Sequence, residues 1–359
     1  MTKAHHPNIK SHCEERFSVT KQSQALPANR AWVERDCFGR RRLAMTWYFY
    51  WRRSMYVLRG FSIVLIMLMS DGVLTAQDFV PLWPKGKMPN SRGLIIKDSV
   101  ADERVYQVAT PGMYAFFPSK QENKGSAVII CPGGGYQRLA YITGGTQLAK
   151  WFNTMGITAF VLIYRLPHSP DLVQREIGPL QDAQRAMRVV RSRAAEWGIK
   201  PEKIGVMGTS AGGHLAALLS TRDDDVSAVR DQLDTISFAP NYMILISPVI
   251  SMGKVAHVGS RKNLIGENPS PQLIEKYSLE LQVTQKTPPC FLVDAFNDKS
   301  VHPSNSQMFY AALLEKNVVT SFHVFPQGGH AIGVGNNPGS TSFWNQLCEA
   351  WMREMGFIP

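Results

Sequence analysis

Short apolar runs alternate with helix-like stretches from about residue 113 onward. Several runs are almost continuous in Val, Ile, Leu and Phe, which is typical of strands buried on both faces of a parallel sheet. The alternation therefore predicts an α/β protein with a doubly wound, mostly parallel sheet and helices on both faces. The expected strands are 113–117, 127–131, 157–164, 203–207, 242–250, 290–295 and 322–325, and the expected helices are 146–155, 180–197, 211–220, 304–316 and 342–355.

One helix pattern shows clearly which side should face the core. Apolar residues recur at helical spacing between Leu180 and Ala194. This spacing leaves Arg185, Arg188 and Arg191 mostly on the opposite, outward face.

Residues 77–359 are expected to form a single domain. The segment 77–112, rich in Pro, Gly and Lys, is expected to wrap this domain. The segment 251–286 interrupts the alternation and predicts a small helical excursion over the site, where loops often determine the substrate.

The basic excess of the chain lies mainly in its first 76 residues. They contribute +7 of the formal net charge of +11. Because a nucleic-acid interface needs basic residues on the folded domain itself, this distribution argues against nucleic-acid binding.

A Sec-type signal peptide is predicted at residues 55–76. Three arginines precede the apolar run 61–70, and small or mildly polar residues follow it. The run is shorter than the about 20 apolar residues of a membrane span, so no stable span is expected after cleavage; an uncleaved anchor is the alternative. Residues 1–54 are interpreted as an extension upstream of the true start at Met55, and the protein is expected to be exported to the periplasm or beyond.

The cysteines do not predict a disulfide framework. Two of the five lie in the leader, which leaves Cys131, Cys290 and Cys348. An odd number at these spacings predicts buried free thiols. Neither Cys-x-x-Cys nor His-Glu-x-x-His occurs in the chain, so neither a metal site nor a cofactor is expected.

The strongest chemical motif is Gly208-Thr-Ser210-Ala-Gly212, which lies directly between an apolar run and a helix-forming run. Glycines on both sides of the serine allow a strained strand-to-helix turn that presents its hydroxyl. The turn also places Ser210 at a helix N-terminus, whose dipole favours developing negative charge. We predict that Ser210 is a nucleophile.

A glycine-rich loop, Cys131-Pro-Gly-Gly-Gly-Tyr136, follows another apolar run. Acyl transfer creates an oxyanion on which backbone N–H groups must converge, and glycines permit that approach because no Cβ intervenes. We predict an oxyanion hole formed by the N–H groups of Gly133, Gly134 and Ala211, with Tyr136 binding substrate. A phosphate-binding loop is the competing use of such glycines, but the Gly-Lys-Ser/Thr ending is missing.

A serine nucleophile needs a histidine base, which in α/β-hydrolases follows both the serine and the acid in the chain. His330 stands in a glycine loop after the last expected strand and before the final helix. We therefore predict that His330 is the base. The other candidates are His214 and His323, both expected to be structural, His257, and His302, which is the runner-up.

The acid is expected on the loop after the penultimate strand. Asp294 still lies inside the strand-like run, whereas Asp298 lies beyond its end, where its side chain can turn toward His330. We predict that Asp298 completes the triad by fixing the imidazole tautomer and stabilising the imidazolium.

At these motifs the chain resembles bacterial α/β-hydrolases of the acetyl-esterase group, which are labelled xylanase, acetylxylan-esterase-like or feruloyl-esterase-like. The similarity covers about residues 111–355. Besides the two glycine motifs it includes Phe160-Val-Leu-Ile-Tyr-Arg165 and Pro179-Leu-Gln-Asp182-Ala-Gln-Arg185. The resemblance implies the α/β-hydrolase fold. Arg165, Asp182 and Arg185 match the family and are expected to form an internal ion-pair network; the alternative is that they are neighbours of the catalytic site.

The resemblance also implies a serine carboxylesterase that removes acetyl or similar short acyl groups from plant polysaccharides or oligosaccharides. A glycosidase is not expected, because glycoside hydrolysis usually needs two carboxylates flanking the bond. Two alternatives stay open: a serine peptidase of the prolyl-oligopeptidase type, and a non-catalytic carbohydrate-binding protein on the same fold. The oligomeric state is not predicted.

Overall fold

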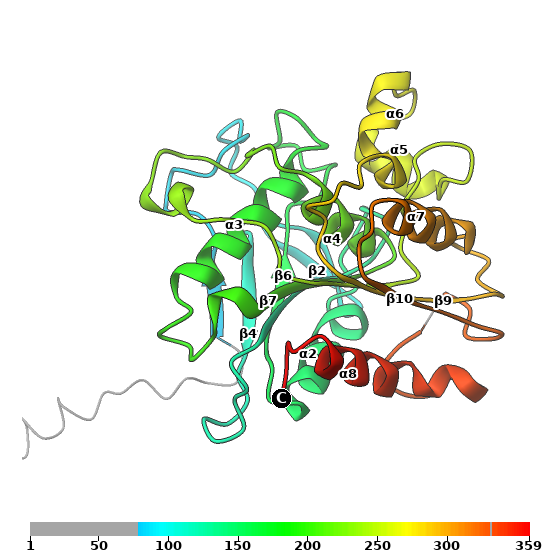
Figure 1. Cartoon of the computed structure of the whole chain (residues 1–359). Helices are drawn as coiled ribbons and strands as arrows, with labels where there is room; N and C mark the ends of the chain where they lie inside the picture. The colour runs from blue at the N-terminus through cyan, green and yellow to red at the C-terminus, as the bar shows by residue number, and fades with distance from the viewer. Residues whose placement is uncertain (1–77, 331) are drawn as a thin grey trace, which may run out of the picture. The chain divides into compact units, whose positions relative to one another are not determined.

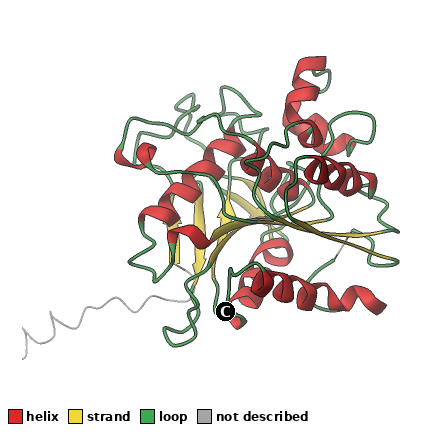
Figure 2. Cartoon of the chain, viewed as in Figure 1, coloured by secondary structure: helices red, strands yellow, loops and turns green. Residues whose placement is uncertain are grey.

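An eight-stranded sheet runs through residues 78–330 and 332–359, the part of the chain that this computed structural model describes. Its strands follow the order β1-β4-β6-β5-β7-β8-β9-β10 (Figure 1, Figure 2). Neighbours from β6 to β10 are parallel, whereas β4 is antiparallel to both β1 and β6. The mostly parallel sheet expected from the sequence is confirmed. The strands are β1 (Asp78–Pro81), β4 (Gly112–Phe116), β5 (Ala127–Cys131), β6 (Thr158–Ile163), β7 (Ile204–Thr209), β8 (Met243–Ile246), β9 (Cys290–Ala295) and β10 (Thr320–Phe325).

Helices cover both faces of the sheet, as Figure 1 shows. On one face lie α3 (Gly178–Ser192), α4 (Ala211–Thr221) and α7 (Ser304–Glu315). On the other lie α2 (Gln147–Thr154) and α8 (Trp344–Glu354). Every residue of β5, β6, β8 and β9 is buried, which is why these strands read as continuous apolar runs.

Two expected elements end four or five residues earlier in the structure than the sequence predicted. The run 242–250 is a strand only to Ile246, because Ser247 takes a left-handed φ of 43° and ends it. The helix expected over 180–197 ends at Ser192. In both cases apolar residues continue beyond the end of the element, so the sequence pattern did not show where the strand or the helix ends.

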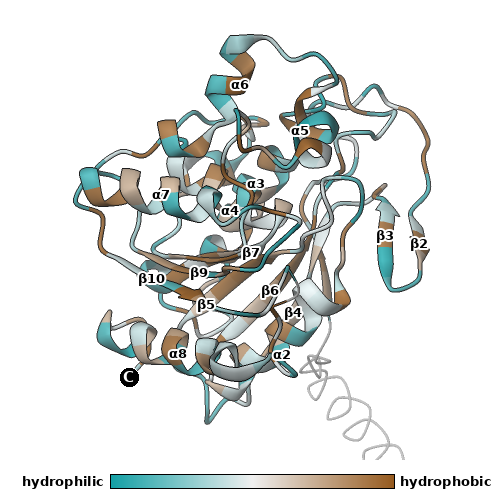
Figure 3. Ribbon diagram, turned by 90° about the vertical axis from the view of Figure 1, so that its right-hand side faces the viewer, coloured by the Kyte–Doolittle hydropathy of each residue, from teal (hydrophilic) through white to brown (hydrophobic). Residues whose placement is uncertain are grey.

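Two segments outside the alternation lie beside the sheet. In the first, β2 (Ser99–Ala101) and β3 (Arg104–Gln107) form a separate two-stranded hairpin. In the second, α5 (Val258–Ile265) and α6 (Pro271–Tyr277) form the expected helical excursion. Figure 3 shows α5 and α6 at the top of the view and the hairpin at its right edge.

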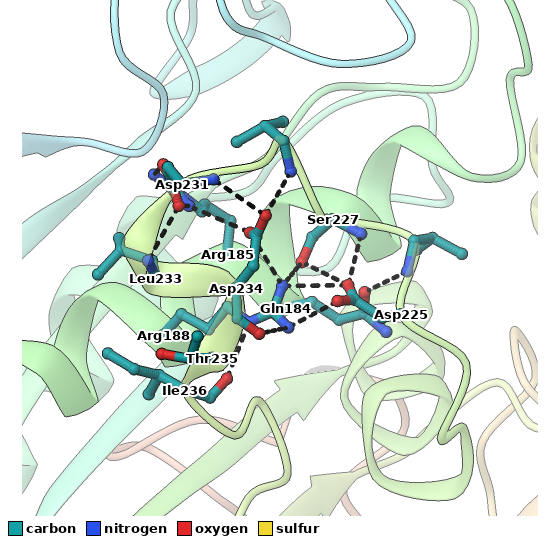
Figure 4. Close-up of polar contacts among 12 residues, drawn as sticks. Gln184, Arg185, Arg188, Asp225, Ser227, Asp231, Leu233, Asp234, Thr235 and Ile236 are labelled. Carbon is teal, nitrogen blue, oxygen red and sulfur yellow. Dashed lines mark hydrogen bonds and ion pairs between the residues drawn. The ribbon is translucent and has the colours of Figure 1, made fainter.

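The structure corrects the expectation that Arg185 and Arg188 face outward, whereas Arg191 stays partly exposed. Arg185 and Arg188 are only 2% and 3% exposed, because residues 222–240 fold back across α3 (Figure 4). Two N–H groups of Arg185 bond to Asp231 at 2.9 and 2.6 Å, and two of Arg188 bond to Asp225 at 3.0 and 2.7 Å. The loop thus neutralises the charges that it buries.

A second buried ion pair joins Arg165 to Asp182, as expected, whereas Arg185 pairs with Asp231 instead of joining this pair. The side chains of Arg165 and Asp182 are almost fully enclosed. Asp182 accepts Arg165 Nη2–H at 2.9 Å, the Arg165 backbone N–H at 2.8 Å and Trp83 Nε1–H at 2.8 Å. These hydrogen bonds and the ion pair offset the free energy that is lost when the Asp182 carboxylate is removed from water.

Cys131, Cys290 and Cys348 are buried free thiols, as predicted. The proposed extension at 1–54 and signal peptide at 55–76 lie outside the described residues. Within the described ranges, no helix has the length and apolar character to cross a bilayer.

Candidate active site

Ser210 stands at the turn between β7 and α4, with φ 55° and ψ −123°. A serine in this region is strained, and such strain persists only where the surroundings enforce it. A Cβ on Gly208 would overlap the Gly212 carbonyl oxygen, and a Cβ on Gly212 would overlap that of Cys131. The two motif glycines are therefore required by the close approach of β5, β7 and α4.

The structure brings the three predicted triad residues together. His330 Nε2 lies 2.8 Å from Ser210 Oγ, and His330 Nδ1 lies 2.7 Å from Asp298 Oδ2. Asp298 Oδ1 accepts the backbone N–H groups of Ser300 and Val301 at 2.8 and 3.0 Å. The carboxylate is thereby fixed with one oxygen facing the imidazole.

The pKa values of the two neighbouring aspartates, Asp294 and Asp298, shift in opposite directions. Burial raises the pKa of Asp298, but hydrogen bonds from His330 and from the Val301 N–H outweigh it and hold that pKa below its usual value. Burial raises the pKa of Asp294 to about 6 despite the hydrogen bond from Ser306 Oγ. Asp294 contacts Ser306 and the Ala295 N–H rather than the imidazole. The geometry therefore supports Asp298 as the acid.

The glycine loop lies beside the serine. A Cβ on Gly133 would meet the Thr209 carbonyl oxygen at 2.7 Å and Ser210 Cβ at 3.1 Å. Gly133 and Gly134 line the same pocket as Ser210. Ala211 is the first residue of α4, where N–H groups have no acceptor inside the helix. The predicted oxyanion donors thus lie in the elements adjoining Ser210.

The prediction that Tyr136 binds substrate is corrected by its position. Its side chain is fully buried, and its hydroxyl lies 2.9 Å from His214 Nδ1. A left-handed φ of 58° at Tyr136 accompanies this inward placement. His214 Nε2 lies 2.9 Å from the Tyr277 carbonyl oxygen. Tyr136 therefore ties the glycine loop to α4 and to the end of α6.

His214 is structural, as predicted. Burial lowers its pKa to about 4, although the hydrogen bond to Tyr277 opposes the shift. The neutral ring donates from Nε2 to the Tyr277 carbonyl and accepts the Tyr136 hydroxyl at Nδ1. Of the other candidates, His302 accepts the Ser304 N–H at the start of α7, and His323 pairs with Ser321 on β10.

His257, which the sequence offered only as a candidate base, is part of the pocket wall. His257 caps α5, accepting the Ser260 N–H at Nδ1 over 3.1 Å, and lines the pocket. This contact places the ring hydrogen on Nε2. Burial and the neighbouring His330 lower the pKa of His257, so its ring is a neutral hydrogen-bond donor.

A pocket of about 580 Å³ opens over Ser210 and His330. Its wall combines polar and apolar surface, and most of it comes from residues that the sequence did not single out. Among the described residues no group of His, Cys, Asp or Glu could hold a metal ion. Polar wall residues include Arg104, Gln137, Arg138, Thr143, Gln147 and Asn263.

Comparison with known proteins places the chain among esterases and xylanase-labelled proteins. Residues 113–313 match the family described as BD-FAE. The chain is 34% identical over 227 residues to endo-1,4-beta-xylanase B of Butyrivibrio fibrisolvens, covering 63% of this chain and 35% of that protein. It is 35% identical over 228 residues to an acetylxylan esterase of Xylanibacter ruminicola, covering 62% and 44%. The chain thus spans less than half the length of these two relatives.

Solved structures show the same fold. The acetyl ester-xyloside bifunctional hydrolase of Caldicellulosiruptor lactoaceticus matches with a TM-score of 0.68 and 34% identity, over 80% of this chain and 100% of that one. An esterase of Thermogutta terrifontis matches with a TM-score of 0.59 and 24% identity, over 77% and 97%. The expected α/β-hydrolase fold and the resemblance to acetylxylan-esterase-like proteins are confirmed.

Proposed function

The chain belongs to the BD-FAE family, and on that premise we propose that it is a serine carboxylesterase that removes short acyl groups from carbohydrate esters. The observation that carries the proposal is the continuous run of contacts from Ser210 Oγ through His330 to Asp298, at 2.8 and 2.7 Å. This arrangement suits acyl transfer through a covalent intermediate.

The proposed reaction has two steps that use the same groups. His330 takes the Ser210 proton while Ser210 Oγ attacks the ester carbonyl, and backbone N–H groups of Gly133, Gly134 and Ala211 hold the oxyanion. His330 then gives the proton to the departing alkoxide, which leaves an acyl group on Ser210. Water, activated by His330, releases the acid by the same route.

The ionised Asp298 supports both steps by electrostatics. As His330 gains a proton, its positive charge forms beside a carboxylate whose pKa is held low. The two backbone N–H groups on Asp298 Oδ1 keep that carboxylate from rotating. A negative charge that is already in place stabilises the imidazolium in the transition state without having to reorient during the reaction.

The pocket wall supports a sugar as the alcohol part of the ester. Thr143, Gln147 and Asn263 offer hydroxyl and amide groups, which match the donors and acceptors of a carbohydrate. A volume of about 580 Å³ lies in the range usual for small-molecule sites. The names of two relatives, an acetylxylan esterase and an acetyl ester-xyloside hydrolase, agree with acetylated xylan or its oligosaccharides as substrate.

Hydrolysis of p-nitrophenyl acetate, butyrate and octanoate by the full chain tests the proposal. We expect acetate to be cleaved fastest and Ser210→Ala to lose about 10⁴-fold or more of the rate. Ser192→Ala, on the far end of α3, is the matched control and should keep the wild-type rate. Activity that survives Ser210→Ala, or cleavage of peptide amides in place of esters, contradicts the proposal.

We also propose export, with residues 55–76 as the signal peptide, because a polymeric substrate lies outside the cytoplasm. N-terminal sequencing of the protein from its native host is expected to begin at Gln77. A mature protein that retains any of residues 1–54 contradicts both this and the start at Met55.

A further inference from the structure

The pocket over Ser210 contains two arginines, Arg104 and Arg138, and no carboxylate side chain among its lining residues. We propose that the esters cleaved by this protein carry a carboxylate, which Arg104 and Arg138 bind. The inference rests on the proposed esterase function and names the class of its substrate: an acylated acidic sugar, or the ester of a dicarboxylic acid.

Backbone pairing brings the two arginines together from distant parts of the chain. Val105 of β3 and Leu139 exchange two backbone hydrogen bonds, at 3.0 and 2.8 Å. Arg104 and Arg138 each precede one member of this pair. Val105 and Leu139 are buried, whereas Arg104 and Arg138 both line the pocket.

Arg138 is also tied to the predicted oxyanion loop. Its backbone N–H donates to the Gly134 carbonyl at 3.2 Å. A Cβ on Gly134 would meet Arg138 Cγ at 3.1 Å. The turn that carries Gly133 and Gly134 therefore also fixes the backbone of Arg138 beside the predicted oxyanion hole.

Neither arginine has a carboxylate partner within residues 78–330 and 332–359. Arg104 Nη1 donates to the Asp102 backbone carbonyl at 3.2 Å, and Arg138 Nη1 to Gln137 Oε1 at 3.5 Å. These contacts leave most guanidinium N–H groups available. Arg185 and Arg188 of α3 are different, since Asp231 and Asp225 neutralise them.

The remaining charges near the pocket do not cancel the two arginines. Asp298 is enclosed and already bonded to His330. Asp102 and Glu103 lie exposed at the hairpin turn and do not line the pocket. The wall thus presents positive charge beside neutral amides and hydroxyls. A guanidinium offers a planar fork of N–H donors that fits a carboxylate, which makes a carboxylate the complementary group.

The carboxylate can belong to either half of the ester, and paired substrates distinguish the two. An acetylated methyl glucuronoside is compared with the matching glucuronamide, in which only the charge of the alcohol part is removed. Monomethyl succinate is compared with methyl succinamate, which removes the charge of the acyl part. The measured quantity is the ratio of kcat/KM for acid over amide.

We expect this ratio to be at least about fivefold in one of the two pairs, because one partly exposed arginine–carboxylate contact changes affinity by about this factor. Arg104→Gln and Arg138→Gln should each lower the ratio, and the double variant should bring it to about one. Raising the salt from about 0.05 M to about 0.5 M should also lower it, since exposed charges are screened.

Arg353→Gln is the matched control. Arg353 is an exposed arginine of α8 that pairs with Glu349, so its loss changes the net charge equally without touching the pocket. The ratio should stay at the wild-type value in this variant. Thermal unfolding of each variant checks that the fold is retained.

Three outcomes overturn the proposal, and they separate it from the proposed function. Ratios near one in both pairs, with p-nitrophenyl acetate still cleaved through Ser210, refute the acidic substrate and leave the esterase intact. A ratio that persists in the double variant refutes the assignment to these arginines. Failure to cleave any of these esters, p-nitrophenyl acetate included, refutes the esterase itself and the inference with it.

Discussion

Replacing Asp298 with Asn tests how this carboxylate controls the proton on His330. Asp298 Oδ1 accepts the N–H groups of Ser300 and Val301 at 2.8 and 3.0 Å, while Oδ2 lies 2.7 Å from His330 Nδ1. An asparagine keeps its carbonyl oxygen on the two N–H groups, so its NH₂ group points at His330. The imidazole must then accept at Nδ1 and carry its hydrogen on Nε2, where it cannot take the proton of Ser210.

The loss expected from this wrong tautomer is about 10⁴-fold in kcat, which corresponds to about 5 kcal/mol of activation free energy. The shape of the side chain is unchanged, so substrate binding should change little. The pKa of Asp298 is lowered in the folded state, so its charge contributes stability at neutral pH that is lost as the pH falls through that pKa. Asp298→Asn should therefore also lower the free energy of unfolding at neutral pH.

The assay compares initial rates with p-nitrophenyl acetate for Asp298→Asn and for Asp294→Asn, a matched control four residues earlier. Asp294 contacts Ser306 and the Ala295 N–H, so its variant should keep the rate within about tenfold. Equal losses in the two variants, or an Asp298→Asn enzyme that retains more than about a tenth of the wild-type rate, refute the assignment of the acid.

Three further predictions concern the scaffold of the site. Gly212→Ala places a Cβ against the Cys131 carbonyl oxygen. We expect the free energy of unfolding to fall by about 3 kcal/mol and Tm, measured by calorimetry, to fall by about 6–12 °C. An unchanged Tm contradicts the close packing around this turn. Arg165→Met leaves Asp182 buried and unpaired, so urea unfolding should show a loss of about 3–5 kcal/mol, partly recovered when Asp182→Leu is added; no recovery argues against an unpaired charge as the cause. For His214 the folded pKa is about 4 against the usual 6.5, so the unfolded chain takes up the proton first and stability falls by about 3 kcal/mol as the pH drops from about 6.5 to about 4. His214→Phe should remove this part of the acid sensitivity, and stability curves of variant and wild type that run parallel with pH would show the reasoning to be wrong.

The sequence predicted the features that depend on local backbone chemistry and chain order. Positions 208 and 212 must be glycine because a Cβ there would overlap the backbone of a neighbouring segment. The motif therefore predicted the turn that carries Ser210. Asp298 and His330 each follow a strand of one parallel sheet. The ends of parallel strands meet at one edge, and this brings both loops to the serine.

The sequence did not reveal how loops pack over these elements. Helical spacing placed Arg185 outside the sheet-facing stripe, but nothing in that spacing shows that residues 222–240 bury it. Tyr136 follows three glycines at the site, yet the turn directs its ring toward His214.

The pocket wall was missed for the same reason. Arg104 reaches the site through the pairing of Val105 with Leu139, a contact between segments with no shared motif. His257 enters on the excursion that carries α5. Such non-local contacts depend on the whole packed structure, so periodicity cannot predict them.

The central claim, that Ser210 is the activated nucleophile, is tested most directly by labelling the full chain with a fluorophosphonate probe and mapping the adduct by peptide mass spectrometry. The account predicts one adduct on Ser210, loss of esterase activity in proportion to labelling, and no labelling of Ser210→Ala. An adduct on another residue, or an enzyme that stays unlabelled while it cleaves p-nitrophenyl acetate, contradicts the account.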